Sequence, residues 1–285
     1  MSPLAASVPR DPSTYVAFHI RTFAALSVAG FRRYATYRQA TVAGTFTNVV
    51  FGFLKTYVLL AVVAGSGAST VAGYSREQLV TFVWAGQGIL TVVWLWGWTD
   101  LADRIRTGDV VTDLLRPVDP VTSYLAADVG RAGHALLTRM IPPMVVGPLF
   151  FPAYLPQRWQ TVPLFLLSVV LATLTCFGCR YLVNASGYWL LDIRGPLILW
   201  MVAAGVLGGL YFPVRFFPDW LAVATWVLTP FPSLFQTPLD VLVERDGPAL
   251  QAGLVGLQAV WAAGLLLACR VVQRRAERKL VVQGG

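Results

Sequence analysis

Long apolar runs separated by short polar connections are the feature that most constrains this chain. The runs reach about 20 residues, the length that an α-helix needs to cross a bilayer. Only 13% of the 285 residues are charged, whereas a soluble domain carries about 25%. The alternating segments of about ten residues that are typical of membrane β-barrels are not seen. The sequence therefore predicts an all-α integral membrane protein.

Six apolar runs predict transmembrane helices, near residues 41–63, 79–98, 133–154, 162–183, 196–212 and 252–271. The stretch before them, residues 15–38, has arginines and one apolar helical face, which is typical of a helix in the membrane interface. Prolines in the third run predict a kinked or partly unwound helix. We expect a single domain with a cytoplasmic tail and interfacial helix (1–40), a six-helix membrane domain (41–271) and a cytoplasmic tail (272–285).

A seventh apolar run, residues 216–235, is interrupted by three prolines. About ten uninterrupted helical residues remain, too few for a span, so we predict a re-entrant or interfacial segment. Basic residues support this choice, because cytoplasmic connections carry an excess of Lys and Arg. Six spans place both termini and most basic residues on the cytoplasmic side, including Arg131 just before the third span and Arg180 near the end of the fourth. A seventh span would move the basic C-terminal tail outside.

Residues 101–128 form the longest polar connection, between the second and third predicted spans. We interpret its first part as a short helix, a turn at Thr107–Gly108, a second short helix and a stop at the next proline. Val110, Leu114 and Leu115 would give the second helix an apolar side. Such a helix, parallel to the membrane, can transmit force to a partner domain. The alternative is a solvated loop whose charges only confer solubility.

This connection also carries a family pattern. The matching residues are Ile105, Thr107, Gly108, Asp109, Asp113, Leu114, Leu115, Arg116, Pro117 and Pro120. The pattern resembles the permeases of the ABC type-2 exporter family. The run GGLYFPVRFFPDWL and the following TPFPSLFQTPLDVL are similar to the proline-rich extracellular segment with short re-entrant helices that precedes the last span in that family. The resemblance extends over nearly the whole chain.

The resemblance implies a membrane subunit that pairs with a second permease, either an identical copy or a paralogue. Separate cytoplasmic ATPase subunits would drive the pair with ATP and Mg²⁺, in the bacterial cytoplasmic membrane. The printed sequence has no G-x-x-x-x-G-K-[ST] phosphate loop, so we expect neither ATPase activity nor a cofactor in this chain. Coupling to the ATPase is assigned to Arg104, Thr107, Gly108, Asp109, Asp113, Leu114, Leu115, Arg116 and Pro117.

Polar residues on the first predicted span form a second candidate site: Thr41, Thr45, Asn48, Gly52 and Lys55. Their spacing of three or four places them on one side of a helix. Because polar groups in lipid usually face protein or a wet cavity, they predict either a substrate pathway or a packing contact between helices. The end of Lys55 could also reach the membrane surface. A pathway of this kind suits an amphiphilic or hydrophobic substrate.

Gly205, Gly208 and Gly209 predict a small-residue face, including a GxxxG, in the fifth span. In the family, the fifth helix contributes to the dimer interface, which is the role we assign to these glycines. The alternative is chance, because glycine is common in membrane helices.

Other functions fit the sequence less well. Asp100 and Asp103 form a DxxD motif that an intramembrane prenyltransferase would use to hold Mg²⁺, but a second acidic cluster is missing. A secondary transporter would show inverted repeats and charged midplane residues, and neither is seen. A structural scaffold is a further alternative.

Cys176 and Cys179 lie inside an apolar helix and predict packing, not a metal site. The net charge of +8 follows membrane topology and does not indicate nucleic acid binding.

Overall fold

The computed structural model describes residues 12–283 except 68–69 and 191. Across these residues the protein is helical and contains no β-strand, so the predicted all-α class is confirmed. The elements are α1 (Pro12–Ala35), α2 (Arg38–Ser66), α3 (Arg76–Val93), α4 (Asp100–Thr107), α5 (Val110–Leu114), α6 (Pro120–Ala135), the π-helical turn η1 (Leu136–Met140), α7 (Ile141–Phe150), α8 (Thr161–Ala185), η2 (Ser186–Tyr188), α9 (Arg194–Leu207), η3 (Val214–Phe216), α10 (Asp219–Leu228), η4 (Phe231–Ser233), α11 (Gln236–Leu242) and α12 (Pro248–Gln283).

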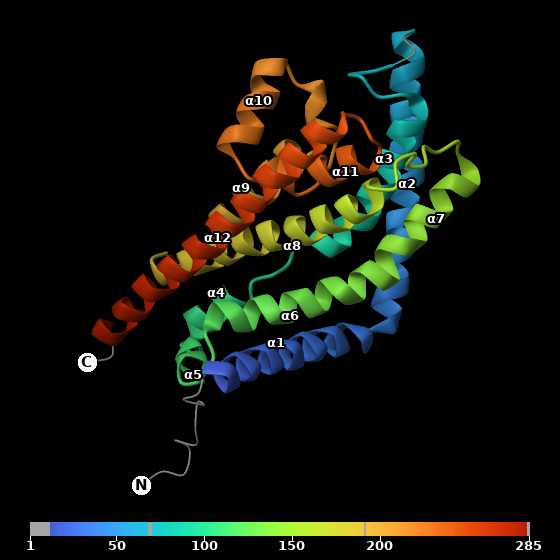
Figure 1. Ribbon diagram of the computed structural model, residues 1–285. Helices are drawn as coiled ribbons and strands as arrows, with labels where there is room; N and C mark the ends of the chain where they lie inside the picture. Colours follow the sequence, from blue (N-terminus) through green and yellow to red (C-terminus); the bar gives the residue numbers. More distant parts are fainter. Residues whose placement is uncertain (1–11, 68–69, 191, 284–285) are drawn as a thin grey trace.

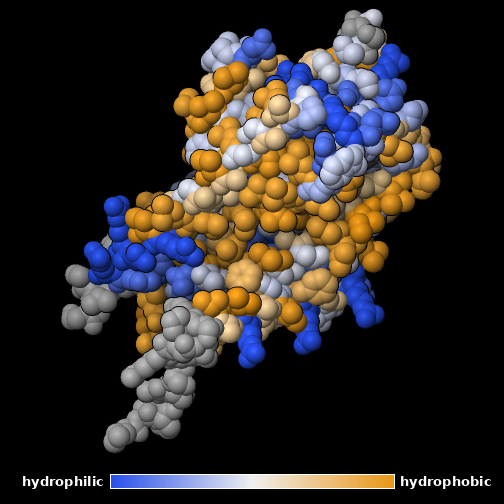
Figure 2. Space-filling view, viewed as in Figure 1, coloured by the Kyte–Doolittle hydropathy of each residue, from blue (hydrophilic) through white to orange (hydrophobic). Residues whose placement is uncertain are grey.

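Three of the described helices, α2, α8 and α12, are long and apolar enough to cross a membrane. α9 and α10 are apolar but shorter, with 14 and 10 residues. α6, η1 and α7 follow one another without a break and form one long bent rod (Figure 1). Figure 2 shows hydrophobic side chains over the middle of one face and hydrophilic ones toward its two ends. This distribution is that of a membrane protein.

Capping residues set the two ends of α3. Its start is fixed by a capping box, in which the Ser75 hydroxyl accepts from the amide of Gln78 and the Gln78 side chain accepts from the amide of Ser75. The helix ends at Val93 and not near residue 98 as predicted, because Trp94 adopts a left-handed conformation with φ of 48°. The chain then continues without helix to α4.

The third predicted span begins earlier than the hydropathy pattern indicated. Asp119 caps α6, its carboxylate accepting from the amide of Thr122 at 2.9 Å, and Pro120 occupies the first turn. The kink predicted from the prolines takes the form of η1, which directly precedes Pro142 and Pro143. A proline clashes with the carbonyl four residues earlier, and the wider π-helical turn relieves this clash.

α1 confirms a helix near residues 15–38, and it packs along α6 (Figure 1). The two helices approach most closely at a pair of glycines. A Cβ on Gly130 would lie 1.9 Å from the carbonyl oxygen of Ser27, and one on Gly30 would lie 2.3 Å from the carbonyl oxygen of Ala127. Only glycine allows this distance between backbones. The position of α1 in the membrane interface stays a prediction.

The seventh apolar run does not form a long helix. Its only regular α-helix, α10, has 10 residues and lies between Pro218 and Pro230. This agrees with the predicted short helical stretch, which at 1.5 Å per residue reaches about 15 Å, half the thickness of the hydrocarbon core.

A buried ion cluster connects α6 and α8 to the end of α3. The Asp128 carboxylate accepts from Arg131 Nε and from an Arg180 guanidinium nitrogen, both at 2.7 Å. Arg131 also donates to the carbonyls of Thr91 and Val92, both at 2.8 Å. These carbonyls belong to the last turn of α3, where a cation is favoured by the helix dipole.

Arg131 and Arg180, which the topology prediction counts among the cytoplasmic basic residues, are therefore bound inside the chain. Their side chains are only 5% and 2% exposed. The guanidinium group of Arg131 lies 4.7 Å from the centre of the Trp94 ring, and that of Arg180 lies 5.5 Å from the rings of Trp94 and Trp98. Cation–π contacts of this kind contribute to holding the excess positive charge of the cluster.

The cluster predicts a specific loss of stability. Asp128→Ala leaves two buried guanidinium groups without their counter-ion, which costs about 3–5 kcal/mol. We expect a clearly lower melting temperature for the variant in detergent or nanodiscs. Asp192→Ala is the control, because its partner Arg194 is largely exposed and a surface pair contributes about 0–1 kcal/mol. Equal melting temperatures for the two variants would contradict this role of the cluster.

Candidate functional site

The helix–turn–helix predicted in the polar connection is confirmed. α4 ends at Gly108, whose φ of 82° is favourable only for glycine, and α5 follows directly. Arg104 joins the two helices, because its Nε and a terminal nitrogen donate to the two Asp113 oxygens at 2.7 and 3.0 Å. The Tyr124 hydroxyl of α6 donates to the same carboxylate at 2.9 Å. α4 and α5 thus form one unit attached to α6.

A second attachment holds the start of α4 to α8. The side chain of Asn184 donates to the carbonyl of Trp98 at 3.0 Å and accepts from the amide of Ala102 at 3.2 Å. Asn184 lies one helical turn after Arg180 of the buried ion cluster, and its side chain also donates to the Arg180 carbonyl. The position of α4 therefore follows from that of α8.

These contacts change the roles expected for the residues of α5. Asp113 is bound within the chain and its side chain is only 11% exposed, so it does not present a free charge to a partner. Val110 is buried and does not belong to an exposed apolar side. Leu115 is 80% exposed and Val111 is also exposed, whereas Leu114 is half-buried. The apolar surface available to a partner is thus formed by Val111 and Leu115.

The other residues assigned to coupling lie on the exposed side of the α4–α5 unit. The Thr107 hydroxyl donates to the Asp109 carboxylate at 2.8 Å, Arg116 lies 3.6 Å from Asp113, and Pro117 is exposed.

The DxxD motif of the enzyme alternative is engaged in ion pairs. Asp100 lies 3.6 Å from Arg33, and Asp103 lies 3.4 Å from Arg106. Within the part of the chain that the structure describes, no group of three or more potential metal ligands occurs.

The polar face of α2 is for the most part a packing surface. The Asn48 amide donates to the carbonyl of Gln87 at 3.1 Å, and a Cβ on Gly52 would lie 2.8 Å from the ring of Trp84. Both contacts are with α3. The hydroxyls of Thr41 and Thr45 donate to carbonyls four residues earlier. Four of the five predicted residues therefore form hydrogen bonds or packing contacts within the chain.

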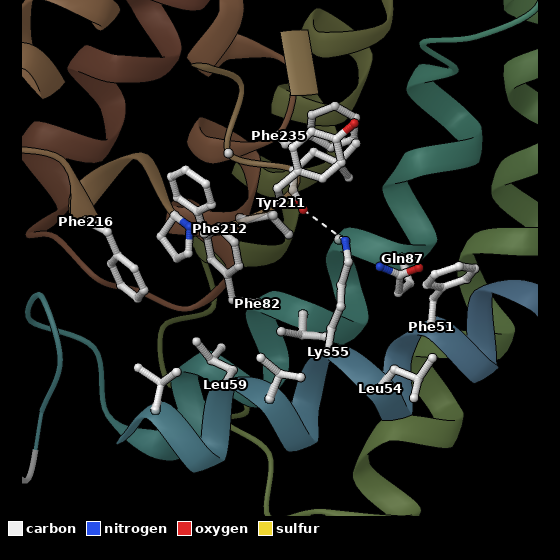
Figure 3. A pocket seen from close by; sticks show the side chains of 18 residues that line it. Phe51, Leu54, Lys55, Leu59, Phe82, Gln87, Tyr211, Phe212, Phe216 and Phe235 are labelled. Atoms are coloured by element: carbon white, nitrogen blue, oxygen red, sulfur yellow. Dashed lines mark hydrogen bonds between the residues drawn. The ribbon is translucent and has the colours of Figure 1, made fainter. Parts of the chain in front are cut away.

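Lys55, the fifth residue, projects into a cavity of 570 Å³ between α2, α3 and the chain that follows α9 (Figure 3). Its Nζ donates to the carbonyl of Leu210 at 3.1 Å. Lys55 is the single charged side chain among the residues that line the cavity. Most of the lining is apolar: Phe51, Leu54, Val58, Leu59, Val62, Phe82, Val83, Gly86, Leu210, Phe212, Pro213, Phe216, Phe235 and Leu239.

Residues 209–216, which we call the roof, cover one side of this cavity. The side-chain oxygen Oε1 of Gln236 accepts from the amide of Val214 at 2.6 Å, and the side-chain Nε2 of Gln236 donates to Asp240 at 2.8 Å. Asp240 is fully buried and also accepts from the Tyr74 hydroxyl. The roof is thus held to α11 and to the loop before α3.

Two ion pairs complete this network. Arg215 of the roof lies 3.4 Å from Asp240 and 2.8 Å from Asp246. Arg245 pairs with Asp246 at 2.7 Å and donates to the carbonyl of Ala72. Sequence reasoning missed this network because its members are far apart in the chain and form no motif. The clustering of acidic residues just before the last apolar run was the one available signal.

The three glycines predicted for the dimer interface do not form a helical face. α9 ends at Leu207, so Gly208 and Gly209 lie beyond the helix, and Gly209 has φ of 85°. All three are buried within the chain. A Cβ on Gly209 would lie 2.6 Å from the Gln236 side chain. The predicted small-residue face is therefore wrong, and Gly209 instead lets the chain turn closely past Gln236 into the roof.

One comparison decides the family. The model of the ABC-2 family transporter protein matches residues 51–284, which include the α4–α5 unit, the buried ion cluster and the roof. The chain belongs to the ABC-2 transporter family. The resemblance inferred from residues 105–120 is thereby confirmed, and this ABC-2 permease is a membrane component of a transporter. Comparison with curated proteins and with solved structures yields no match.

Glu244 holds the end of α11 of the permease against the loop before α8. Its carboxylate accepts from the Thr161 hydroxyl at 2.5 Å, the Arg158 amide at 2.8 Å and the Tyr154 hydroxyl at 2.8 Å. Burial alone raises the pKa of this carboxyl. The hydrogen bonds outweigh burial, so the pKa lies below its usual value.

A depressed pKa makes this contribution to stability depend on pH. The Glu244 carboxylate stabilises the folded state fully above its unfolded pKa of about 4.3, and this contribution is lost as the pH falls through the lower folded pKa. At neutral pH, Glu244→Gln should cost about 2 kcal/mol. The melting temperatures of both proteins should converge as the pH falls through the lowered folded pKa of Glu244. The exposed Asp219→Asn is the control, and a difference between wild type and Glu244→Gln that does not shrink at any acidic pH at which both proteins remain folded would contradict the role of Glu244.

Proposed function

We propose that this ABC-2 permease is the membrane-spanning subunit of an ATP-driven exporter, with six spans and cytoplasmic termini. The spans would be α2, α3, the α6–α7 rod, α8, α9 and α12, while α10 and α11 dip into the outer leaflet. α3 and α9 have 18 and 14 residues, about 27 and 21 Å. Non-helical chain follows each of them. Leu95 and Trp98 after α3, and Gly208, Gly209 and Leu210 after α9, are buried, which supports this topology, because irregular backbone is tolerated at membrane depth only within protein.

The energy source would be a separate cytoplasmic ABC ATPase, and the α4–α5 unit would bind it. Leu115 carries this proposal: a leucine that is 80% exposed on a unit that Arg104 and Asn184 hold in place. An exposed leucine on a fixed support suits an apolar groove of a partner. The unit lies at the opposite end of the molecule from α10 (Figure 1), as expected for a cytoplasmic contact and an outer re-entrant helix.

A second permease, identical or paralogous, would complete the transporter. The cavity at Lys55 opens at the side of this chain, and residues of α2 around its edge, such as Leu54, Val58 and Val62, are exposed apolar side chains. Pairing would cover them and enclose a pathway for an amphiphilic or hydrophobic substrate. Transport, not chemistry, would be the role of this chain, with ATP and Mg²⁺ bound by the ATPase.

Coupling through α5 can be tested with Leu115→Asp. A carboxylate in an apolar groove costs at least about 2 kcal/mol, so capture of the co-expressed ATPase by the tagged permease should fall more than tenfold. ATP-dependent export should fall with it. Membrane insertion should be normal, because no candidate span is changed.

Leu115→Met is the matched control, since it keeps an apolar side chain of similar size and should retain the ATPase. Val110→Asp is a second comparison: it buries a charge in the permease itself and should lower the melting temperature, which Leu115→Asp should leave unchanged. Full ATPase capture by Leu115→Asp would exclude α5 as the contact.

A further inference from the structure

The ammonium group of Lys55 has more hydrogen-bonding capacity than the structure uses. An ammonium group carries three donors, and the contact to the Leu210 carbonyl satisfies one of them. Among the residues that the structure describes, no carboxylate lies within 4.0 Å of Lys55 Nζ. Figure 3 shows the side chain extending from α2 across the middle of the cavity, with its end toward the roof.

Neighbouring charged groups do not supply a counter-ion. Arg215 and Arg245 of the roof network are balanced by Asp240 and Asp246. Lys55 is thus the cation left over in an apolar cavity. A cation in such surroundings is costly unless an anion accompanies it.

The rest of the cavity is suited to an apolar group. Aromatic and branched aliphatic side chains form nearly all of its wall, and its volume of 570 Å³ lies in the range of sites for drug-sized ligands, about 300–1,000 Å³. Phe82, Phe212 and Phe216 surround the space next to the Lys55 side chain (Figure 3). A single charged group at one point of an apolar cavity fixes the orientation of an amphiphile.

We propose that this cavity binds an amphiphile with an anionic head group, which pairs with Lys55 Nζ while the apolar body lies among the phenylalanines. The inference rests on the proposed export of amphiphiles and adds the sign of their charge. The same chemistry could come from two sources, the phospholipids of the bilayer or an exported compound. Gln87, which also lines the cavity, is near enough to the binding space to contact a polar part of the ligand.

Three fluorescent probes with one tail and different head groups test the proposal. They are a dansyl-labelled medium-chain fatty acid, its methyl ester and the corresponding alkylammonium, titrated onto the full-length permease in zwitterionic phosphatidylcholine nanodiscs. The wild type should bind the acid at least about tenfold more tightly than the ester, as expected for a charge-assisted hydrogen bond. The alkylammonium should bind more weakly than the ester.

Variants of Lys55 separate charge from shape. Lys55→Met keeps the length of the side chain and should lose about tenfold in affinity for the acid, with the ester unchanged; binding of the ester then shows that the cavity is intact. Lys55→Arg should retain the preference for the acid, and Lys55→Glu should reverse it in favour of the alkylammonium. Equal binding of acid and ester by the wild type, or an unchanged preference in Lys55→Met, would overturn the proposal.

Two further measurements identify the source of the ligand and keep the two proposals separate. Phosphatidylglycerol added to the nanodisc should displace the acid probe if the ligand is a bilayer lipid, and should leave it bound if the ligand is an exported compound. Flux of the acid probe is then measured in proteoliposomes with the ATPase. Binding that depends on Lys55 without any ATP-driven flux would contradict export of such compounds and leave the anion site established.

Discussion

One carboxylate shared by two buried guanidinium groups fixes the centre of this permease. Asp128 of α6 binds Arg131 and Arg180, and the remaining positive charge is met by the C-terminal carbonyls of α3 and by tryptophan rings. In an apolar interior such charges are stable only when all partners are present. The cluster therefore holds the C-terminal end of α3 to α6 and α8. One turn further along α8, Asn184 holds the start of α4, so the exposed α4–α5 unit is positioned from the same point.

The cavity lies next to the middle of α3, and different contacts hold its walls together. The roof is held by a network in which acidic and basic side chains balance, from Arg215 through Asp240 and Asp246 to Arg245. Lys55 takes no part in these ion pairs. A paired, fixed roof above one unpaired cation is an arrangement that favours a ligand charge of one sign. α3 contacts both regions, since its last turn binds Arg131 and its middle, from Phe82 to Gln87, lines the cavity.

Much of this architecture follows from local sequence. The turn at Gly108, the short α10 between prolines and the family pattern at residues 105–120 depend on neighbours in the chain, and all three predictions are confirmed. Long-range pairing is what the sequence does not reveal. In the sequence, nothing marks Arg180 as a partner of Asp128, and nothing marks Asp113 as a partner of Arg104. Only the fold brings each pair within hydrogen-bonding distance. The glycine face was predicted from spacing alone, but α9 ends at Leu207 and Gly209 packs closely on Gln236, which is again a contact between residues far apart in the chain.

In the proposed transporter, the α4–α5 end of the permease contacts the ATPase and the α10 end does not. Site-specific photo-crosslinking in the assembled, full-length complex tests this arrangement, with the crosslinker introduced in place of Leu115 on one end or Trp220 on the other, both strongly exposed side chains. We expect an ATPase adduct from position 115 and none from position 220. An adduct from position 220 alone would place the ATPase at the opposite end of the molecule and exclude α5 as the contact.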